Sequence, residues 1–346
     1  MKWLAKLALA LTLAIFVGTP RDALAQEGAR GSTQCGQVGD LHFVCNLTNV
    51  EDFLPVDGGH WLVGGSMKVG SVGLYLIDTT AKTAKPVALS IAAKPDPIYK
   101  GCAPPDLKGL STHGLDVVRG KKGTSTVYAV NHGGRESIEV FRLNAAHGKA
   151  EWIGCAVLPE GASGNSVAAV PTGGFVVTKW LDTRNKQDME NVRAGKINGV
   201  VYRWQPGKGY SEVPGTQLSG DNGIVVSPDG KWVFVNAWGT LEVYRVPLSG
   251  TDERTSVKVD FHPDNLRWAP DGKIFVTGQV ITPNGGPGAP VGWATAKLDP
   301  QTMAVAPLVK EPGYAEFEGG TSAVQVGNTM WIGTYRGERI AYRAAP

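Results

Sequence analysis

The feature that most constrains the fold is a phrase of two β-rich runs around a turn, which recurs along the chain. Its clearest copy is residues 221–238, DNGIVVSPDGKWVFVNAW, where a β-branched run leads through Pro-Asp-Gly into a second alternating run. Two such runs around such a turn predict a β-hairpin. A polar pair, Asp221 and Asn222, stands just before the first strand, where a plain core strand would need no polar residue.

Six copies of this phrase follow one another from about residue 50 to residue 335, and their turns are 42 to 64 residues apart. Strand-rich repeats of this length, without a helical period, are typical of β-propellers, in which each repeat forms one blade. The sequence therefore predicts an all-β fold, a six-bladed β-propeller. All-β folds of this length often form one domain, and we expect a single domain over residues 26–346.

The first residues have the three parts of a secretory signal peptide. Lys2 and Lys6 give a basic start, residues 7–17 are apolar, and the segment ends in Ala-Leu-Ala. We expect cleavage after Ala25, so that residues 1–25 are a signal peptide. The apolar run is too short for a transmembrane helix, although an uncleaved anchor is the alternative. The protein is therefore predicted to be secreted or periplasmic, without stable membrane insertion after signal removal.

Charge and cysteine content narrow the possible partners and the compartment. The chain has a formal charge of +3, and no basic run or RNA-binding motif is present, so no nucleic-acid partner is expected. Four cysteines in an oxidising compartment predict two disulfides, with three possible pairings. We favour Cys35–Cys45 and Cys102–Cys155, because the second pair flanks one repeat and would tie neighbouring blades. The sequence has no C-x-x-C spacing, which argues against a redox or zinc site.

Polar residues recur at one register of the repeats, about six to eight residues before each turn. The innermost strand of each blade lines the central channel, so equivalent positions converge at one end of that channel. The residues at this register are Glu51, His113, Asn165, Asn222 and Asn265, with Asp264 beside the last. Their carboxylate and amide oxygens suit a calcium ion, whose double charge two carboxylates would neutralise. The alternative is that Asn and Asp simply open turns before strands.

Two histidines lie at the same end of the second repeat, His113 before the inner strand and His132 after its partner strand. A pair of imidazoles within reach of each other relays a proton near neutral pH. A buried histidine bonded to the backbone is the alternative. Neither a G-x-S-x-G elbow nor a dinucleotide-binding G-x-G-x-x-G is present in the sequence.

The third repeat is interrupted by the polar residues 181–198, LDTRNKQDMENVRAGKIN, with a short helix expected around Lys186–Arg193. Long insertions of this kind either roof a binding pocket or form an ordinary solvated loop. The sequence does not decide between these two.

Six segments in order resemble the motifs of the serum paraoxonases and their arylesterase and lactonase relatives. They are VEDFLPVDGG (50–59), THGLDVV (112–118), VNHGGRESIEVFRL (130–143), GNSVAAV (164–170), DNGIVVSPDGKWVFV (221–235) and PDNLRW (263–268). The resemblance covers roughly residues 50–340. The related SMP-30/gluconolactonase and strictosidine-synthase-like propellers share the architecture with less of this detail.

The resemblance implies a calcium ion that polarises an ester or lactone carbonyl, held by Glu51, Asn165, Asn222, Asp264 and Asn265. It implies a catalytic histidine pair, His113 and His132, that activates water. A second, structural calcium in that family is matched by Asp52 and the carbonyl of Leu115, whereas Ser166 stands where the family has an acidic ligand. The insertion 181–198 lies where the family places an active-site segment.

The predicted function is calcium-dependent hydrolysis of lactones or aryl esters, with a small-molecule lactone or ester as the partner. Two alternatives stay open. One is a non-catalytic, calcium-stabilised binding propeller, and the other is a sugar-lactone hydrolase.

Overall fold

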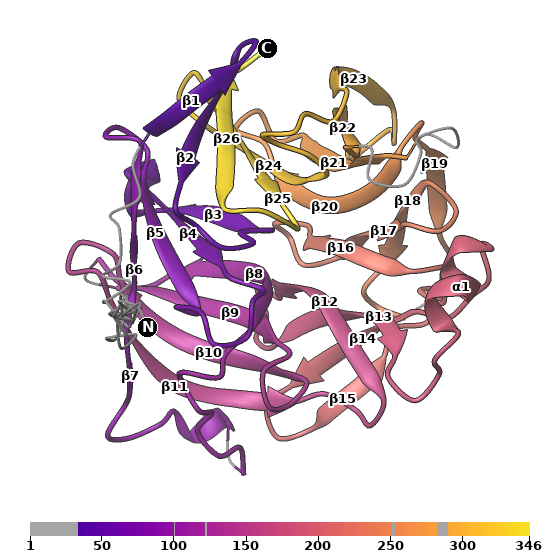
Figure 1. Cartoon of the computed structure of the whole chain (residues 1–346). Coiled ribbons are helices and arrows are strands. Elements are labelled where there is room, and N and C mark those ends of the chain that lie inside the picture. The colour runs from indigo at the N-terminus through magenta and orange to yellow at the C-terminus, as the bar shows by residue number, and fades with distance from the viewer. Residues whose placement is uncertain (1–33, 100, 122, 251–252, 282–289) are drawn as a thin grey trace, which may run out of the picture. The chain divides into compact units, whose positions relative to one another are not determined.

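The computed structural model describes residues 34–346 with the exception of 100, 122, 251–252 and 282–289. Six sheets are arranged in a ring, with one strand of each sheet nearest the centre (Figure 1), and their strands pair antiparallel except for one outer strand. The predicted six-bladed β-propeller is thereby confirmed. The predicted signal peptide, residues 1–25, and the domain start at residue 26 lie outside the described residues.

Blades 1 to 3 come first along the chain, each written here in chain order. Blade 1 contains β3 (Phe53–Val56), β4 (Trp61–Gly65), β5 (Leu74–Asp78) and β6 (Thr83–Pro86). Blade 2 contains β7 (Ala88–Ile91), β8 (Thr112–Arg119), β9 (Ser125–Asn131), β10 (Ser137–Asn144) and β11 (Lys149–Val157). Blade 3 contains β12 (Ala162–Ala169), β13 (Phe175–Asp182), β14 (Val200–Gln205) and β15 (Gly209–Glu212).

Blades 4 to 6 complete the ring. Blade 4 contains β16 (Asp221–Val226), β17 (Trp232–Ala237), β18 (Glu242–Pro247) and β19 (Thr255–Lys258). Blade 5 contains β20 (His262–Trp268), β21 (Ile274–Val280), β22 (Gly292–Leu298) and β23 (Val305–Glu311). Blade 6 contains β1 (Gln34–Val38), β2 (Leu41–Cys45), β24 (Gly320–Val326), β25 (Thr329–Thr334) and β26 (Arg339–Ala344).

The ring is closed by pairing between the two ends of the described chain. Strand β2 pairs antiparallel with β26 of the last blade. This pairing joins both ends of the described chain in one blade, and each blade keeps only a short outer edge strand. It also fixes blade 1 beside blade 6, which brings Glu51 next to the start of β24.

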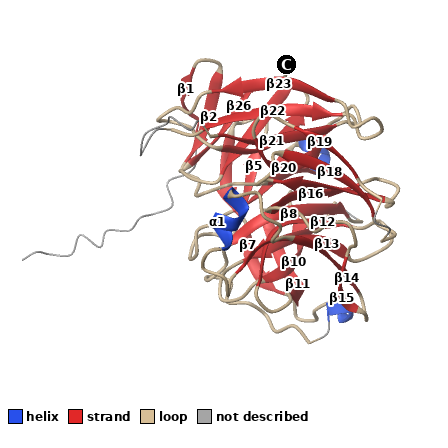
Figure 2. Cartoon of the chain, turned by 90° about the vertical axis from the view of Figure 1, so that its right-hand side faces the viewer, coloured by secondary structure: helices blue, strands red, loops and turns tan. Residues whose placement is uncertain are grey.

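Apolar side chains fill the spaces between neighbouring blades. One cluster joins Ile138 and Val140 of blade 2 to Val167 and Phe175 of blade 3, and five further clusters do the same around the ring. Seen from the side, the sheets stack on one another (Figure 2). Along each strand, side chains point alternately toward the neighbouring blade on one side and the neighbouring blade on the other, since successive side chains point to opposite faces of a sheet.

Both predicted disulfides are present, Cys35–Cys45 and Cys102–Cys155. The reason given for the second was wrong. Cys155 lies on β11 and Cys102 in the segment leading to β8, so the bond ties the lead-in of blade 2 to an outer strand of the same blade. An unexpected strand, β7, pairs parallel with β11 at this outer edge.

The insertion in blade 3 contains a short helix as predicted, α1 (Asp188–Arg193). The Asp188 carboxylate accepts hydrogen bonds from the Asp182 backbone and from the Asn198 side chain. Asn198 in turn accepts a bond from the Gly220 backbone N–H, which pins the insertion to blade 4. Among the described residues, no helix has the length and apolar character needed to span a membrane.

Candidate functional site

The predicted polar residues lie at matching irregularities of the inner strands. In β8, β12, β16, β20 and β24 the pairing with the next strand breaks register at the same place, a few residues from the strand start. The broken positions contain His113, Asn165, Asn222 and the pair Asp264–Asn265. A β-bulge frees residues from the ladder and re-aims their side chains. The five irregularities, with Glu51 just before β3, therefore place these side chains at one end of the ring.

These side chains are buried and several of their oxygens have no partner. The six residues Glu51, His113, Asn165, Asn222, Asp264 and Asn265 are each at most 9% exposed. Four oxygens make no hydrogen bond to the described residues: Glu51 Oε2, Asn165 Oδ1, Asn222 Oδ1 and Asn265 Oδ1. An unsatisfied buried acceptor costs about 1–3 kcal/mol, so four of them are expected to share a cation or a donor.

Electrostatics at this cluster favour binding of positive charge. Burial, followed by the nearby Asp264 and Asp52 carboxylates, raises the pKa of Glu51 well above its ordinary value. Burial also raises the pKa of Asp264 to about 7, against hydrogen bonds from Gln279 and other groups. Asn265 Nδ2 donates to Glu51 Oε1, which joins blades 5 and 1. A cation placed among these carboxylates would relieve their mutual repulsion and favour their ionised forms.

The two predicted histidines are in contact, and the second of them also contacts a carboxylate that the sequence reasoning missed. His113 Nδ1 lies 3.0 Å from His132 Nε2. His132 Nδ1 lies 2.9 Å from both carboxylate oxygens of Glu136. Burial, followed by the neighbouring His132, lowers the pKa of His113 well below its ordinary value. Glu136 is four residues after His132 in a loop, and its spacing alone gave no sign of this contact.

The positions matched to a second metal ion hold a different arrangement. The Arg267 guanidinium donates to both oxygens of Asp52 and to the carbonyl oxygen of Leu115. Ser166 lies beside Asn165 on β12, and its buried hydroxyl has no hydrogen-bond partner in the described part of the chain. A buried arginine therefore occupies the space between Asp52 and Leu115, and these residues do not fit a second ion.

The sixth blade also contributes to the site. Thr321 and Ser322 lie at the register break of β24, and both hydroxyls donate to the backbone carbonyl of Glu51, at 2.6 and 2.9 Å. The sequence contained the signal, because Thr-Ser stands in the sixth copy where Asp-Asn stands in the fifth. These hydroxyls fix the backbone that carries the Glu51 carboxylate.

A half-buried aromatic group borders the cluster on the side of blades 3 to 5. Trp238 Nε1 donates to Gln279 Oε1 at 2.8 Å, and Gln279 Nε2 donates to Asp264 Oδ2. The ring of Trp238 contacts His262 at 4.1 Å and Trp180 at 5.7 Å between centroids. Trp180 directly precedes the insertion. Its contact with Trp238, and the hydrogen bonds from Trp238 through Gln279, therefore connect the insertion to Asp264.

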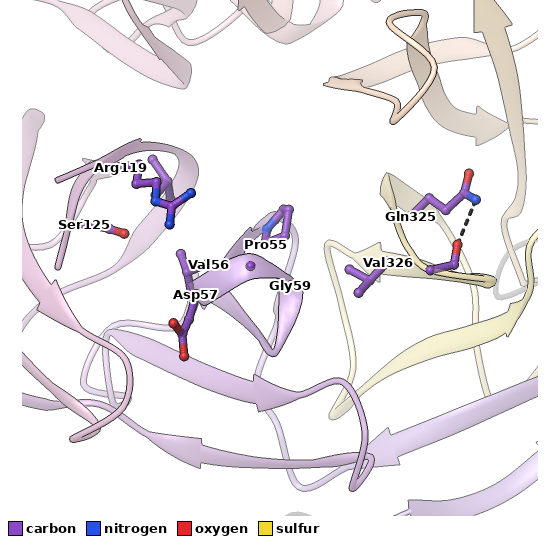
Figure 3. Close-up of a pocket in the computed structure, with 11 residues that line it drawn as sticks. Pro55, Val56, Asp57, Gly59, Arg119, Ser125, Gln325 and Val326 are labelled. Atoms are coloured by element: carbon purple, nitrogen blue, oxygen red, sulfur yellow. Dashed lines mark hydrogen bonds between the residues drawn. The ribbon is translucent and has the colours of Figure 1, made fainter. Parts of the chain in front are cut away.

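A cavity of about 370 Å³ lies at the opposite ends of the inner strands. Figure 3 shows Arg119 and Ser125 on one side of it and Gln325 and Val326 on the other. Strand β8 carries His113 near its start and Arg119 at its end, so the cavity is separated from the polar cluster by the length of a strand. It contains none of the predicted site residues.

The donor set of the cluster fits a calcium ion. Two carboxylates and three side-chain amides supply hard oxygen ligands, which are the ligands that calcium prefers. The four unpartnered oxygens all belong to residues of this set. No group of three or more His, Cys, Asp or Glu side chains in metal-binding geometry was found among the described residues. The candidate set differs from such a group because three of its five side chains are amides.

The fold and the polar cluster define a class, the six-bladed propellers with an oxygen-lined site at one end of the central channel. Within that class, residues 118–281 match the model of the SMP-30/gluconolactonase/LRE-like region, slightly less than half of the chain. The predicted resemblance to gluconolactonase-related propellers is thereby confirmed. A search of curated protein sequences found no match.

Several solved structures share the fold at low sequence identity. A luciferin-regenerating enzyme is 13% identical with a TM-score of 0.57, over 87% of this chain and 92% of its own. A gluconolactonase from Xanthomonas campestris is 16% identical with a TM-score of 0.55, over 92% and 96%. A putative gluconolactonase is 16% identical with a TM-score of 0.51, over 87% and 90%. At these identities the likeness concerns the fold alone.

Proposed function

We propose that the protein is a calcium-dependent hydrolase of lactones or aryl esters. The observation that carries this proposal is the position of four unpartnered buried oxygens beside the chain of His113, His132 and Glu136. The match to a gluconolactonase-related model supports a lactone hydrolase as the broader class. Two disulfides fit an oxidising compartment and support export to the periplasm or the exterior.

The hydrogen bonds support Nε2 as the nitrogen of His113 that accepts a proton. The Glu136 carboxylate can only accept, so His132 Nδ1 carries a hydrogen and His132 Nε2 is left as an acceptor. His113 Nδ1 must then donate to His132 Nε2. The free lone pair of neutral His113 is consequently on Nε2, which lies 3.6 Å from Glu51 Oε2. The basic nitrogen thus faces the oxygen cluster.

Hydrolysis follows from this arrangement. Glu51, Asn165, Asn222, Asp264 and Asn265 would hold the calcium ion. When bound, calcium supplies Lewis-acid polarisation of the substrate carbonyl. His113 Nε2 takes a proton from water as the water oxygen bonds to the carbonyl carbon. The ester C–O bond then breaks, and His113 returns the proton to the leaving oxygen. His132 and Glu136 hold the positive charge on the imidazole pair during these steps.

The aromatic border favours substrates with an apolar or aromatic part. Trp238 is two hydrogen bonds from Asp264 through Gln279, and Trp180 packs against it at the base of the insertion. Half-buried tryptophan rings provide a flat apolar surface for an aryl leaving group. A sugar lactone is the second candidate substrate, because the family model and the Xanthomonas neighbour both concern gluconolactonases.

The proposed function is tested by hydrolysis of phenyl acetate, dihydrocoumarin, γ- and δ-lactones and gluconolactone with purified protein. We expect turnover that is lost in EGTA and restored by calcium. A rise in melting temperature with calcium but no turnover of any substrate would instead support the non-catalytic binding propeller. Preference for gluconolactone over the aryl substrates would favour the sugar-lactone alternative.

The role of the histidines is separated from calcium binding by His113→Gln, with calcium affinity measured independently by calorimetry. We expect kcat to fall by about 10²–10⁴, the usual contribution of general base catalysis, while calcium affinity is retained. His147→Gln is the matched control, because His147 is exposed and its ring bonds the Asn144 side chain. Unchanged turnover in His113→Gln would remove the histidine pair from the mechanism.

A further inference from the structure

A single arginine lies in the central channel beside the oxygen cluster and joins blades on opposite sides of the ring. Arg267 lies on β20 of blade 5 and reaches Asp52, just before blade 1, and Leu115 of blade 2 on the opposite side. Its side chain is 4% exposed and that of Asp52 is 0% exposed. Such a pair is found in a protein interior only where its charges and hydrogen bonds are matched.

The Asp52 carboxylate has all of its hydrogen-bond acceptor sites occupied. Asp52 Oδ1 accepts from Phe53 N at 2.9 Å and from Arg267 Nε at 3.0 Å. Asp52 Oδ2 accepts from Leu115 N at 2.8 Å and from Arg267 Nη2. A carboxylate has about four lone-pair sites, so Asp52 has none left for a metal ion.

The guanidinium also uses most of its own donors. Arg267 Nη2 donates to the Leu115 carbonyl at 3.0 Å, and Nη1 donates to the Leu266 carbonyl at 2.8 Å. The planar fork of arginine suits this set of oxygens, which lie around it on three segments of chain. The carbonyl of Leu115, a potential ligand of a second ion, is therefore already bonded.

Charge balance at the oxygen cluster agrees with these contacts. Arg267 neutralises Asp52, which leaves Glu51 and Asp264 as the two carboxylates of the oxygen cluster. Two negative charges match one divalent ion, whereas a second divalent ion beside Arg267 would be repelled by it at close range. On its other side Arg267 lines a channel cavity of about 220 Å³ together with Asp116.

We propose that the Arg267 guanidinium is the permanent cation of the inner channel, bridging Asp52 and the Leu115 carbonyl so that the protein takes no metal ion there. It joins blades 1, 2 and 5 by a bond that chelators cannot remove. The oxygen cluster above it then remains as the only calcium position that the described channel residues provide. This inference concerns the second position and does not depend on the proposed catalysis.

The test is to count calcium ions by native mass spectrometry in wild-type protein and in Glu51→Gln/Asp264→Asn, which lacks both carboxylates of the cluster. We expect at most one ion per wild-type chain and none in the double variant. An ion that persists in the folded double variant would overturn the inference. Wild-type protein without any ion would contradict the proposed calcium cluster while leaving the role of Arg267 intact.

The converse experiment adds Arg267→Ser to the double variant and opens the space beside Asp52. We expect a lower melting temperature without calcium, and the return of one bound ion with a calcium-dependent rise in melting temperature. Arg142→Ser is the control, because Arg142 forms an exposed ion pair with Glu151 at 3.4 Å and should change neither quantity. A triple variant that folds with unchanged stability and no ion would contradict the inference. If the triple variant does not fold, the ion count of the double variant decides.

Discussion

At the scale of single residues, the site is defined by what its side chains lack. Asn165, Asn222 and Asn265 are almost fully buried, and each has a side-chain oxygen without a partner. In a protein interior such groups normally find hydrogen bonds, so an orphaned set at one place indicates a ligand. Asp52 shows the opposite case, because every acceptor site on its carboxylate is occupied.

This contrast leads to a prediction for Asn222→Leu. The change removes a buried oxygen without a partner, which favours stability, but it also removes the hydrogen bond of Asn222 to Asp264, so the stability of the calcium-free protein should change little. The same change removes a proposed ligand, so the rise in melting temperature caused by calcium should shrink. Asn236→Leu is the comparison, because Asn236 also has a buried oxygen without a partner and donates to the Asp264 carbonyl at 2.7 Å but is not a proposed ligand, so the rise in melting temperature caused by calcium should be retained. Equal calcium stabilisation in wild type and Asn222→Leu would contradict the proposed ligand set.

At the scale of elements, the register breaks of the inner strands form the site. They occur at equivalent positions in five strands, and each inner strand lies against the next around the channel. The approach is so close that a side chain on the residue after Asn222 would overlap the next blade. A Cβ on Gly223 would lie 2.3 Å from the Asp264 carbonyl oxygen.

Gly223→Ala should therefore push β20 away from β16 and displace Asp264. We expect a loss of stability of about 1–3 kcal/mol from overpacking, together with weaker calcium binding. Calorimetric titration and chemical denaturation measure the two effects. The control is Gly109→Ala, where the nearest atom to an added Cβ is 3.4 Å away and neither quantity should change. Wild-type calcium affinity in Gly223→Ala would show that the site does not depend on this close contact.

At the scale of the whole molecule, the ring concentrates buried acids from different blades in one channel. Burial raises the pKa values of Glu51, Asp116 and Asp264, in the last case to about 7. The closure of the ring by β2 and β26 keeps these acids together, since Glu51 and Asp264 belong to blades separated by blade 6.

The calcium-free protein should lose stability as pH rises from about 4 to 7 and beyond. Asp264 has a pKa of about 7 in the folded chain, above its ordinary value, so the folded state binds more protons than the unfolded state in this range. The stabilising contribution is full at low pH and is lost as pH rises through the folded pKa. Calcium should reverse the trend, because it binds the ionised carboxylates. Urea denaturation at several pH values measures this, and Asp264→Asn should flatten the slope of the calcium-free protein.

Whereas it left three disulfide pairings possible, the sequence alone determined the six blades and the register of the polar residues. These are local or periodic properties, because alternation, turn residues and repeat spacing are set by near neighbours in the chain. Only the tertiary structure brought Glu136 to His132 and Arg267 to Asp52, the latter across 215 residues of sequence. Such contacts depend on the position of each blade in the ring and on which polar groups the other blades place nearby. No local sequence pattern encodes contacts between different blades. The unpartnered oxygens of the cluster and the fully bonded carboxylate of Asp52 therefore became visible only in the folded chain.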